Sequence, residues 1–142
     1  MIVYVDTSFL VAAYVVDAQS LVVANLLASH PHLCLTPFHC SEAANAIYRQ
    51  VFTGRLSLPG AKTAWQSFEA DTAAGVWQTV DFPTLAWDVC IGLALRYSAT
   101  IGVRTLDSLH VACALELKAD RFWTFDERQA RLAEAVGLDT KA

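Results

Sequence analysis

The sequence lacks the features of a membrane protein and of a disulfide-rich secreted protein. Its longest uninterrupted apolar run, residues 9–16, has eight residues, which is too short to span a membrane. No basic segment precedes the first apolar stretch, so we expect no secretory signal and predict a cytoplasmic protein. The four cysteines lie in apolar contexts without C-x-x-C spacing, which favours buried thiols over a zinc site or disulfides.

The sequence also lacks the short motifs of several enzyme classes. Neither G-x-x-x-x-G-K-[ST] nor G-x-G-x-x-G occurs, so a nucleotide-binding loop is not expected, and G-x-S-x-G is absent too. The net charge of −4, from 14 acidic and 10 basic residues, excludes a strongly basic nucleic-acid-binding protein. A phosphate-bearing substrate is still compatible with this charge if a bound divalent cation supplies local positive charge.

The chain has, instead, a large apolar fraction. Hydrophobic residues make up 55% of its 142 residues and the mean hydropathy is +0.37, which exceeds the usual share for a soluble domain. The length suits a single domain over residues 1–142, and the apolar surplus predicts a surface that binds a partner. The amphipathic segments 18–29 and 38–52 are the expected sites of an apolar groove.

Short apolar segments alternate with helical patterns along the whole chain. Strands are predicted at residues 2–5, 33–36, 76–80 and 121–124, and helices at residues 9–16, 17–29 or 20–29, 37–52, 58–72, 83–99, 106–117 and 127–136. Ser8 is the expected N-cap of the first helix and Thr105 that of the sixth. This alternation favours an α/β fold with a central parallel β-sheet, in which functional sites lie beyond the carboxyl ends of the strands.

Four acidic residues stand at this end of their predicted elements. Asp6 directly follows the first strand, and Asp126 follows the fourth by two residues. Glu42 and Asp107 lie in the first turns of two helices, where the helix dipole alone accounts for each. An N-cap accounts for Asp126 and a strand-end turn for Asp6. Taken together, however, four carboxylates beside apolar runs predict a cation that offsets their desolvation.

The chemistry expected of such a cluster is metal-dependent hydrolysis at phosphorus. Mg²⁺ and Mn²⁺ prefer oxygen ligands and bind through carboxylates, waters and substrate phosphates. Two ions about 3.5–4 Å apart stabilise both the attacking and the leaving oxygen of an in-line displacement. A carboxylate that is not itself a ligand accepts the proton of the attacking water.

The ordered motifs resemble the PIN domain family, and within it the VapC-type toxins of bacterial toxin–antitoxin pairs. The motifs are Asp6-Thr-Ser8, Ser41-Glu42-x-x-Asn45, Leu106-Asp107-x-x-His110 and Thr124-x-Asp126. The resemblance covers essentially the whole chain. It implies a three-layer α/β/α fold and a Mg²⁺- or Mn²⁺-dependent endoribonuclease that cleaves single-stranded or loop RNA. It also implies a homodimer and a cognate antitoxin, bound as a helix in an apolar groove.

By this match, the family's acidic metal site corresponds to Asp6, Glu42, Asp107 and Asp126, and its small hydroxyl positions around the site to Thr7, Ser8 and Thr124. The roles of His110, Arg104 and Glu127 stay open. A zinc site at His39 and Glu42 is not favoured, because no third nitrogen or sulfur ligand lies near them in the sequence.

Other functions remain open at this point. One is a PIN-domain ribonuclease of ordinary RNA turnover without an antitoxin, and another is a non-catalytic interaction module of the same fold. A phosphohydrolase with Asp6 as its nucleophile is disfavoured, because such enzymes carry a second aspartate where this chain has Ser8.

Overall fold

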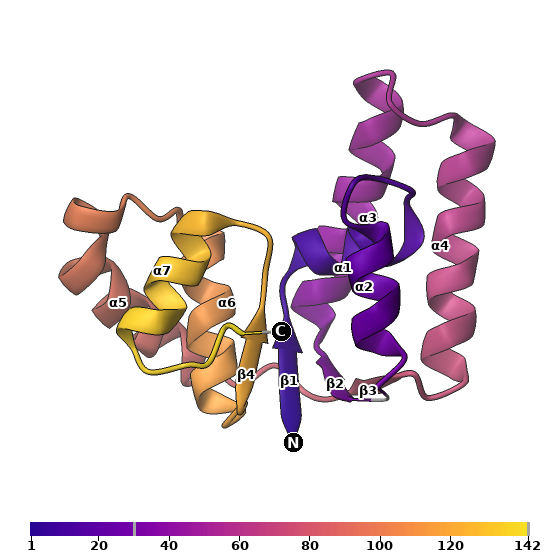
Figure 1. The fold of residues 1–142 in the computed structure, drawn as a ribbon. Helices are drawn as coiled ribbons and strands as arrows, with labels where there is room; N and C mark the ends of the chain where they lie inside the picture. The colour runs from indigo at the N-terminus through magenta and orange to yellow at the C-terminus, as the bar shows by residue number, and fades with distance from the viewer. Residues whose placement is uncertain (30, 142) are drawn as a thin grey trace.

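A computed structural model describes residues 1–29 and 31–141. Four parallel strands form one sheet in the order β3-β2-β1-β4 (Figure 1). The strands are β1 (Ile2–Val5), β2 (His32–Leu35), β3 (Trp77–Thr79) and β4 (Arg121–Trp123). An isolated parallel bridge also pairs Asp139 with Arg121 of β4.

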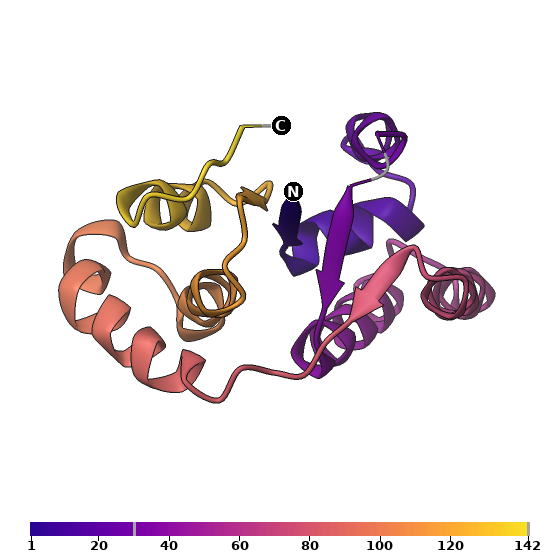
Figure 2. The ribbon, with the colours of Figure 1, turned by 90° about the horizontal axis from the view of Figure 1, so that it is seen from below.

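Helices cover both sides of the sheet. They are α1 (Thr7–Tyr14), α2 (Ser20–Leu27), α3 (Pro37–Phe52), α4 (Leu58–Ala73), α5 (Ala86–Ile101), α6 (Thr105–Glu116) and α7 (Glu127–Ala135). Seen along two directions, α5, α6 and α7 lie on one side and α1 to α4 on the other (Figures 1 and 2). The predicted three-layer α/β/α fold with a central parallel β-sheet is confirmed. No helix within the described ranges is long and apolar enough to cross a membrane.

The order of the strands fixes where a site can form. The chain passes from β1 to β2 to β3 in one direction and then returns through α5 and α6 to place β4 on the other side of β1. The direction in which successive strands are added to the sheet therefore reverses between β1 and β4. A crevice opens at such a reversal, beyond the carboxyl ends of the strands, and Asp6 and Asp126 both follow strands that end there.

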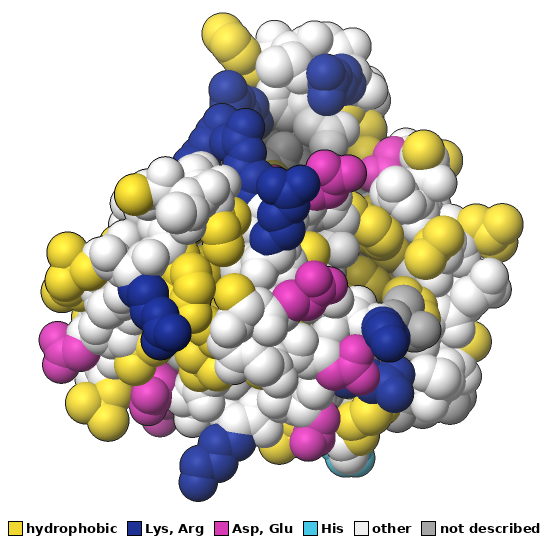
Figure 3. Space-filling view, turned by 60° about the vertical axis from the view of Figure 1, so that its left-hand side comes forward, with side chains coloured by type: hydrophobic (Ala, Val, Ile, Leu, Met, Phe, Trp, Pro, Cys, Tyr) yellow, Lys and Arg dark blue, Asp and Glu magenta, His cyan; other side chains and the backbone are white. Residues whose placement is uncertain are grey.

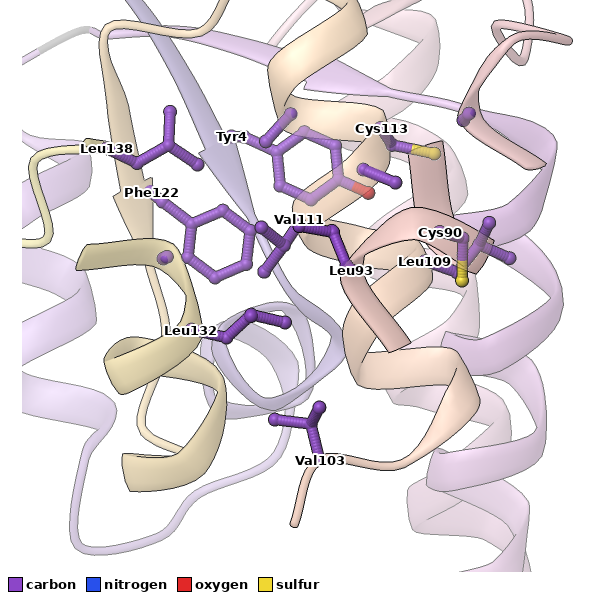
Figure 4. Close-up of a cluster of buried hydrophobic side chains, with 14 residues drawn as sticks. Tyr4, Cys90, Leu93, Val103, Leu109, Val111, Cys113, Phe122, Leu132 and Leu138 are labelled. Atoms are coloured by element: carbon purple, nitrogen blue, oxygen red, sulfur yellow. The ribbon is translucent and has the colours of Figure 1, made fainter. Parts of the chain in front are cut away.

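Alternating side chains of β1 enter two cores, as expected of a strand buried on both faces. Tyr4 points into the core of α5, α6 and α7, where its ring stacks on Phe122 with centroids 5.4 Å apart (Figure 4). Val3 and Val5 enter the second core, formed with α1 to α4. Burial of β1 on both faces fixes its position, and hence the position of the Asp6 backbone that follows it.

Two helix starts differ from the sequence-based expectation. Helix α1 is capped by Asp6 and not by Ser8, because the Asp6 carboxylate accepts the backbone N–H of Phe9 at 3.0 Å. Helix α6 begins at Thr105, so Thr105 is its first residue and not its cap. Its N-cap residue is Arg104, whose backbone N–H donates to the Asp107 carboxylate at 3.3 Å.

Helix α5 also begins later than predicted. The sequence places its start at Pro83 and Thr84, but the helix starts at Ala86. The backbone N–H of Ala86 donates to the carbonyl of Pro83 at 2.9 Å, so the residues before the helix form a tight turn instead.

All four cysteines are free thiols; Cys34, Cys90 and Cys113 are buried and Cys40 is partly buried.

Candidate functional site

The most deeply buried of the four carboxylates is Asp6, which is 3% exposed. Ser8 Oγ donates to its Oδ1 and Thr124 Oγ1 donates to its Oδ2, each at 2.6 Å. Burial raises the pKa of Asp6, and these hydrogen bonds offset only part of that rise. All of the hydrogen-bond donors to Asp6 in the described residues are neutral, so the charged form lacks a paired cation.

Asp126 is joined to Asp6 through Thr124. The backbone N–H of Asp126 donates to Thr124 Oγ1 at 3.0 Å, and the same hydroxyl donates onward to Asp6. The Asp126 side chain is exposed and caps α7 by accepting the backbone N–H of Gln129 at 2.9 Å. Asp126 therefore lies at the solvent edge of the site, whereas Asp6 lies at its base.

Glu42 is held by His110 and Thr7. His110 Nε2 donates to Glu42 Oε1, and Thr7 Oγ1 donates to the same oxygen at 2.7 Å. Burial raises the pKa of Glu42, but the hydrogen bond and charge of His110 outweigh it, so that the pKa is lowered overall. The side chain is 21% exposed, and it stays ionised at neutral pH.

His110 is itself fixed by an aromatic neighbour. Its Nδ1 lies 2.8 Å from the hydroxyl of Tyr4, and its ring packs against Phe38 with centroids 4.3 Å apart. Because the Glu42 carboxylate only accepts, Nε2 carries a hydrogen, and Nδ1 forms the second hydrogen bond of the ring with the Tyr4 hydroxyl. His110 is thus a buried residue that contacts the site through Glu42 and Thr7.

Asp107 is held from α7. The side-chain amide of Gln129 donates to Asp107 Oδ1 at 3.1 Å, and the backbone N–H of Arg104 donates to Oδ2. Sequence reasoning did not identify Gln129. A signal was present, because Asp126-x-x-Gln129 matches the capping-box pattern, but its side chain turns to Asp107 and not back to the N-cap.

These contacts place the four predicted carboxylates at one end of the sheet. Thr124 joins Asp6 to Asp126, Gln129 joins Asp126 to Asp107, and Thr7, the residue after Asp6, binds Glu42. Each carboxylate is bound by its own donors. In residues 1–29 and 31–141, no three His, Cys, Asp or Glu side chains come close enough together to share one metal ion.

His39 and Glu127 do not enter this network through their side chains. His39 is buried, accepts the backbone N–H of Thr36 at Nδ1 and lies 2.9 Å from the carbonyl of Val5 through Nε2. Both ring nitrogens are therefore occupied by the backbone, which argues against zinc at this residue. Glu127 is exposed in the first turn of α7.

An open groove of about 1070 Å³ begins beside Glu42 and Asp107. Its walls are α3 and the start of α6. Basic side chains gather beside acidic ones near the top of one face of the molecule (Figure 3). Glu42 and Asp107 therefore adjoin a space that is large enough for a substrate.

Comparison with known proteins identifies the family of this fold. The model of the PIN domain matches residues 3–135. Similar solved structures include VapC20 of Mycobacterium tuberculosis, a sarcin-ricin loop-cleaving toxin, with a TM-score of 0.71 and 19% identity over 96% of this chain and 95% of that chain.

Two further structures are similar over nearly the whole chain. VapBC2 from Rickettsia felis, bound to a DNA fragment from their promoter, has a TM-score of 0.67 and 17% identity, over 99% of this chain and 98% of the other. FitAcB from Neisseria gonorrhoeae has a TM-score of 0.66 and 15% identity, over 99% and 96%. No curated protein sequence matches significantly. Since the family model covers nearly the whole chain, the protein belongs to the PIN domain family.

Proposed function

We propose that this protein is a Mg²⁺- or Mn²⁺-dependent endoribonuclease that cleaves single-stranded or loop RNA, and that it is the toxin of a toxin–antitoxin pair. The observation that carries this proposal is the network that joins Asp6, Glu42, Asp107 and Asp126 beyond the carboxyl ends of β1 and β4. Membership of the PIN family and the likeness of fold to VapC20, a toxin that cleaves the sarcin-ricin loop, support the reaction class.

The donor atoms of the site fit a hard divalent cation. They are carboxylate oxygens, which Mg²⁺ and Mn²⁺ prefer. Asp6 is buried with its charge unmatched by lysine or arginine among the described residues, and a cation would remove that cost. We propose that Asp6, Glu42, Asp107 and Asp126 hold the metal in part through water molecules, because no three of these side chains in the described residues are close enough together to share one ion directly. When bound, it would activate water and neutralise charge on the phosphate.

The surrounding side chains hold these carboxylates in place. Ser8 and Thr124 each occupy one oxygen of Asp6, and each leaves that oxygen a further lone pair for a ligand. Thr7 and His110 both bind Oε1 of Glu42, which leaves Oε2 free of hydrogen bonds within the described residues. We propose that the free oxygen of Glu42 faces the ligand or the attacking water.

The proposed protein partners use apolar surface that the fold leaves exposed. Val16, in the connection between α1 and α2, is 94% exposed, and Leu21 on α2 is 73% exposed, beside a small cavity of about 200 Å³ between the two helices. We propose that an apolar antitoxin helix binds there. The sequence predicts that residues 38–52, which form α3, also contribute to this apolar surface. The face of α3 beside Glu42 is polar and charged, so only the exposed Tyr48 and Phe52 of α3 are available for such a contact.

A second apolar surface lies on α5. Trp87, Ile91 and Leu95 follow one another at intervals of four residues and are 55%, 60% and 85% exposed, so they form a stripe along one helix face. In a two-fold dimer the same surface of both subunits forms the interface, so two copies of such a stripe could pack against each other. We propose that it forms the interface of the homodimer.

The test is metal-dependent RNA cleavage by the purified chain without its antitoxin. RNA should be cut in Mg²⁺ or Mn²⁺ and left intact in EDTA, and Asp6→Asn, Glu42→Gln, Asp107→Asn and Asp126→Asn should each lower the rate by orders of magnitude. Asp88→Asn, an exposed aspartate at the start of α5, is the matched control and should cleave normally. Undiminished cleavage in EDTA would refute the metal mechanism. A normal rate in one of the four variants removes that residue from the site.

A further inference from the structure

The groove beside Glu42 and Asp107 extends well beyond the carboxylates. One wall is the face of α3 from Phe38 to Thr53, and the other is the start of α6. It is lined by Thr7, Phe38, Ser41, Glu42, Asn45, Ala46, Arg49, Gln50, Thr53, Arg55, Arg104, Thr105, Leu106 and Asp107. Most of these side chains are polar, so the groove suits a hydrated, charged ligand better than an apolar helix.

Three arginines give the groove a charge opposite to that of the whole molecule. Arg49, Arg55 and Arg104 line it, against the two carboxylates Glu42 and Asp107, which leaves an excess of one positive charge. The chain as a whole carries −4. A local charge of the opposite sign attracts anionic ligands to this face.

These arginines are available to a ligand. All three are exposed, and none of their guanidinium groups has an ion pair or hydrogen bond within the described residues. Glu42 and Asp107 are instead bound by His110, Thr7 and Gln129. The positive charge of the groove is therefore not neutralised internally. A guanidinium presents a planar fork of donors that matches a phosphate.

Arg104 lies near the carboxylates, and Arg49 and Arg55 lie farther away along α3. Arg104 is three residues before Asp107 and lies at the same helix start. Arg49 follows Glu42 by seven residues on α3, about 10.5 Å farther along the helix axis at about 1.5 Å per residue. Arg55 lies in the turn after α3. A strand whose phosphate sits at the carboxylates would continue past Arg104 towards Arg49 and Arg55.

We propose that this groove binds the RNA strand on one side of the phosphate that is cut. Arg49 and Arg55 contact backbone phosphates distant from the carboxylates, and Arg104 contacts a phosphate next to them. This inference rests on the proposed ribonuclease function and adds the path of the substrate to it. Contacts to phosphates position the strand without reading its sequence, so these arginines contribute to affinity and not to the choice of target.

The test measures RNA binding apart from cleavage. In the Asp6→Asn background, a fluorescein-labelled single-stranded RNA of random sequence and about 16 nucleotides, the upper end of the usual site size, is titrated at several salt concentrations. Arg49→Gln and Arg55→Gln should each weaken binding about fivefold at about 0.1 M salt, and each should make the negative slope of log K against log salt less steep by about 0.7.

The matched control is Arg96→Gln. Arg96 is exposed on α5, where its guanidinium lies 5.2 Å from the centroid of the Tyr97 ring, and it does not line the groove. Its removal lowers the net charge by the same amount and should leave both the affinity and the salt slope unchanged. Thermal melts followed by circular dichroism check that each variant is folded.

Three outcomes would overturn the inference. If the two groove variants and the parent have the same affinity and salt slope, the RNA path along α3 is rejected. The proposed function still stands in that case, provided that the wild type cleaves RNA. An equal loss in Arg96→Gln would show that net charge, and not the groove, binds RNA. Arginine-dependent binding of labelled poly-glutamate without RNA binding would assign the groove to an acidic protein segment. Absence of both RNA binding and wild-type cleavage would instead reject the proposed function itself.

Discussion

The side-chain amide of Gln129 donates a hydrogen bond to Oδ1 of Asp107 at 3.1 Å, across the contact between α7 and α6. The backbone N–H of the same residue binds Asp126 at 2.9 Å. One glutamine thus sets the spacing of two of the four carboxylates. Its own side-chain oxygen is buried without a hydrogen-bond partner in the described residues, so only its donor contributes to this arrangement.

The first prediction concerns Gln129→Leu. The change removes the donor to Asp107 and also removes a buried, unpaired oxygen, so the free energy of unfolding should change by no more than about 1 kcal/mol. RNA cleavage should fall at least tenfold, because Asp107 loses its orientation. Urea unfolding and single-turnover cleavage measure the two effects. Gln66→Leu, at an exposed position on α4, is the control, and normal cleavage by Gln129→Leu would show that Asp107 needs no support from α7.

The second prediction concerns the pH dependence of stability. Burial lowers the pKa of His39 to about 3, below its ordinary value of 6.5 in the unfolded chain. The folded protein thus resists protonation, and the stability that neutral His39 contributes above pH 6.5 is lost as the pH falls towards 3. Between pH 8 and pH 5.5 this residue should lower the free energy of unfolding by about 1.4 kcal/mol.

Chemical denaturation of His39→Gln at the two pH values tests this. The variant should lack that part of the pH dependence, whatever its absolute stability. His32→Gln, at an exposed position of β2, should retain it. Identical pH profiles for wild type and His39→Gln would show that the buried imidazole is not the titrating group.

The third prediction concerns metal binding measured as stability. Because burial raises the pKa of Asp6, its charge at neutral pH is unfavourable without a cation, and Asp6→Asn should not destabilise the metal-free protein. Mn²⁺ at about 100 times its Kd should add about 2.7 kcal/mol to the free energy of unfolding of the wild type. The variant should gain much less. Equal stabilisation of both proteins would place the ion elsewhere.

The sequence is sufficient to predict the strands and the end of the sheet where the carboxylates meet. The reason is local, since β1 is a short apolar run and the residue that follows a buried parallel strand emerges at its carboxyl end. The positions of Asp6 and Asp126 at that end therefore follow from the sequence alone. The structure has Asp6 as the N-cap of α1, whereas the sequence favours Ser8. The sequence does not distinguish them, because both residue types cap helices and their spacing does not decide between them.

The contacts that hold the carboxylates are beyond prediction from sequence. His110 reaches Glu42 across 68 positions of sequence, and Gln129 reaches Asp107 from another helix. Such pairs depend on how α3, α6 and α7 pack, which no local pattern encodes. The stripe on α5 escapes prediction for a different reason. Apolar residues lie on both faces of that helix, with Ala86, Cys90 and Leu93 buried and Trp87, Ile91 and Leu95 exposed, so the sequence offers no contrast between an inner and an outer face.

The last prediction separates the two apolar surfaces. Leu95→Glu puts a charge on the α5 stripe, where Leu95 is 85% exposed, and Leu21→Glu does the same on α2, where Leu21 is 73% exposed. Neither side chain is buried in the monomer, so both variants should fold with nearly unchanged stability. Burying a glutamate in an apolar interface, by contrast, is strongly unfavourable.

In light scattering after gel filtration at micromolar concentration, Leu95→Glu should be a monomer that still binds the antitoxin. Leu21→Glu should remain a dimer that no longer binds it. The candidate antitoxin is the protein encoded by the gene next to that of this chain. If the wild type is itself a monomer and does not bind that protein, both partner assignments fail, and a ribonuclease that acts without an antitoxin becomes the better description.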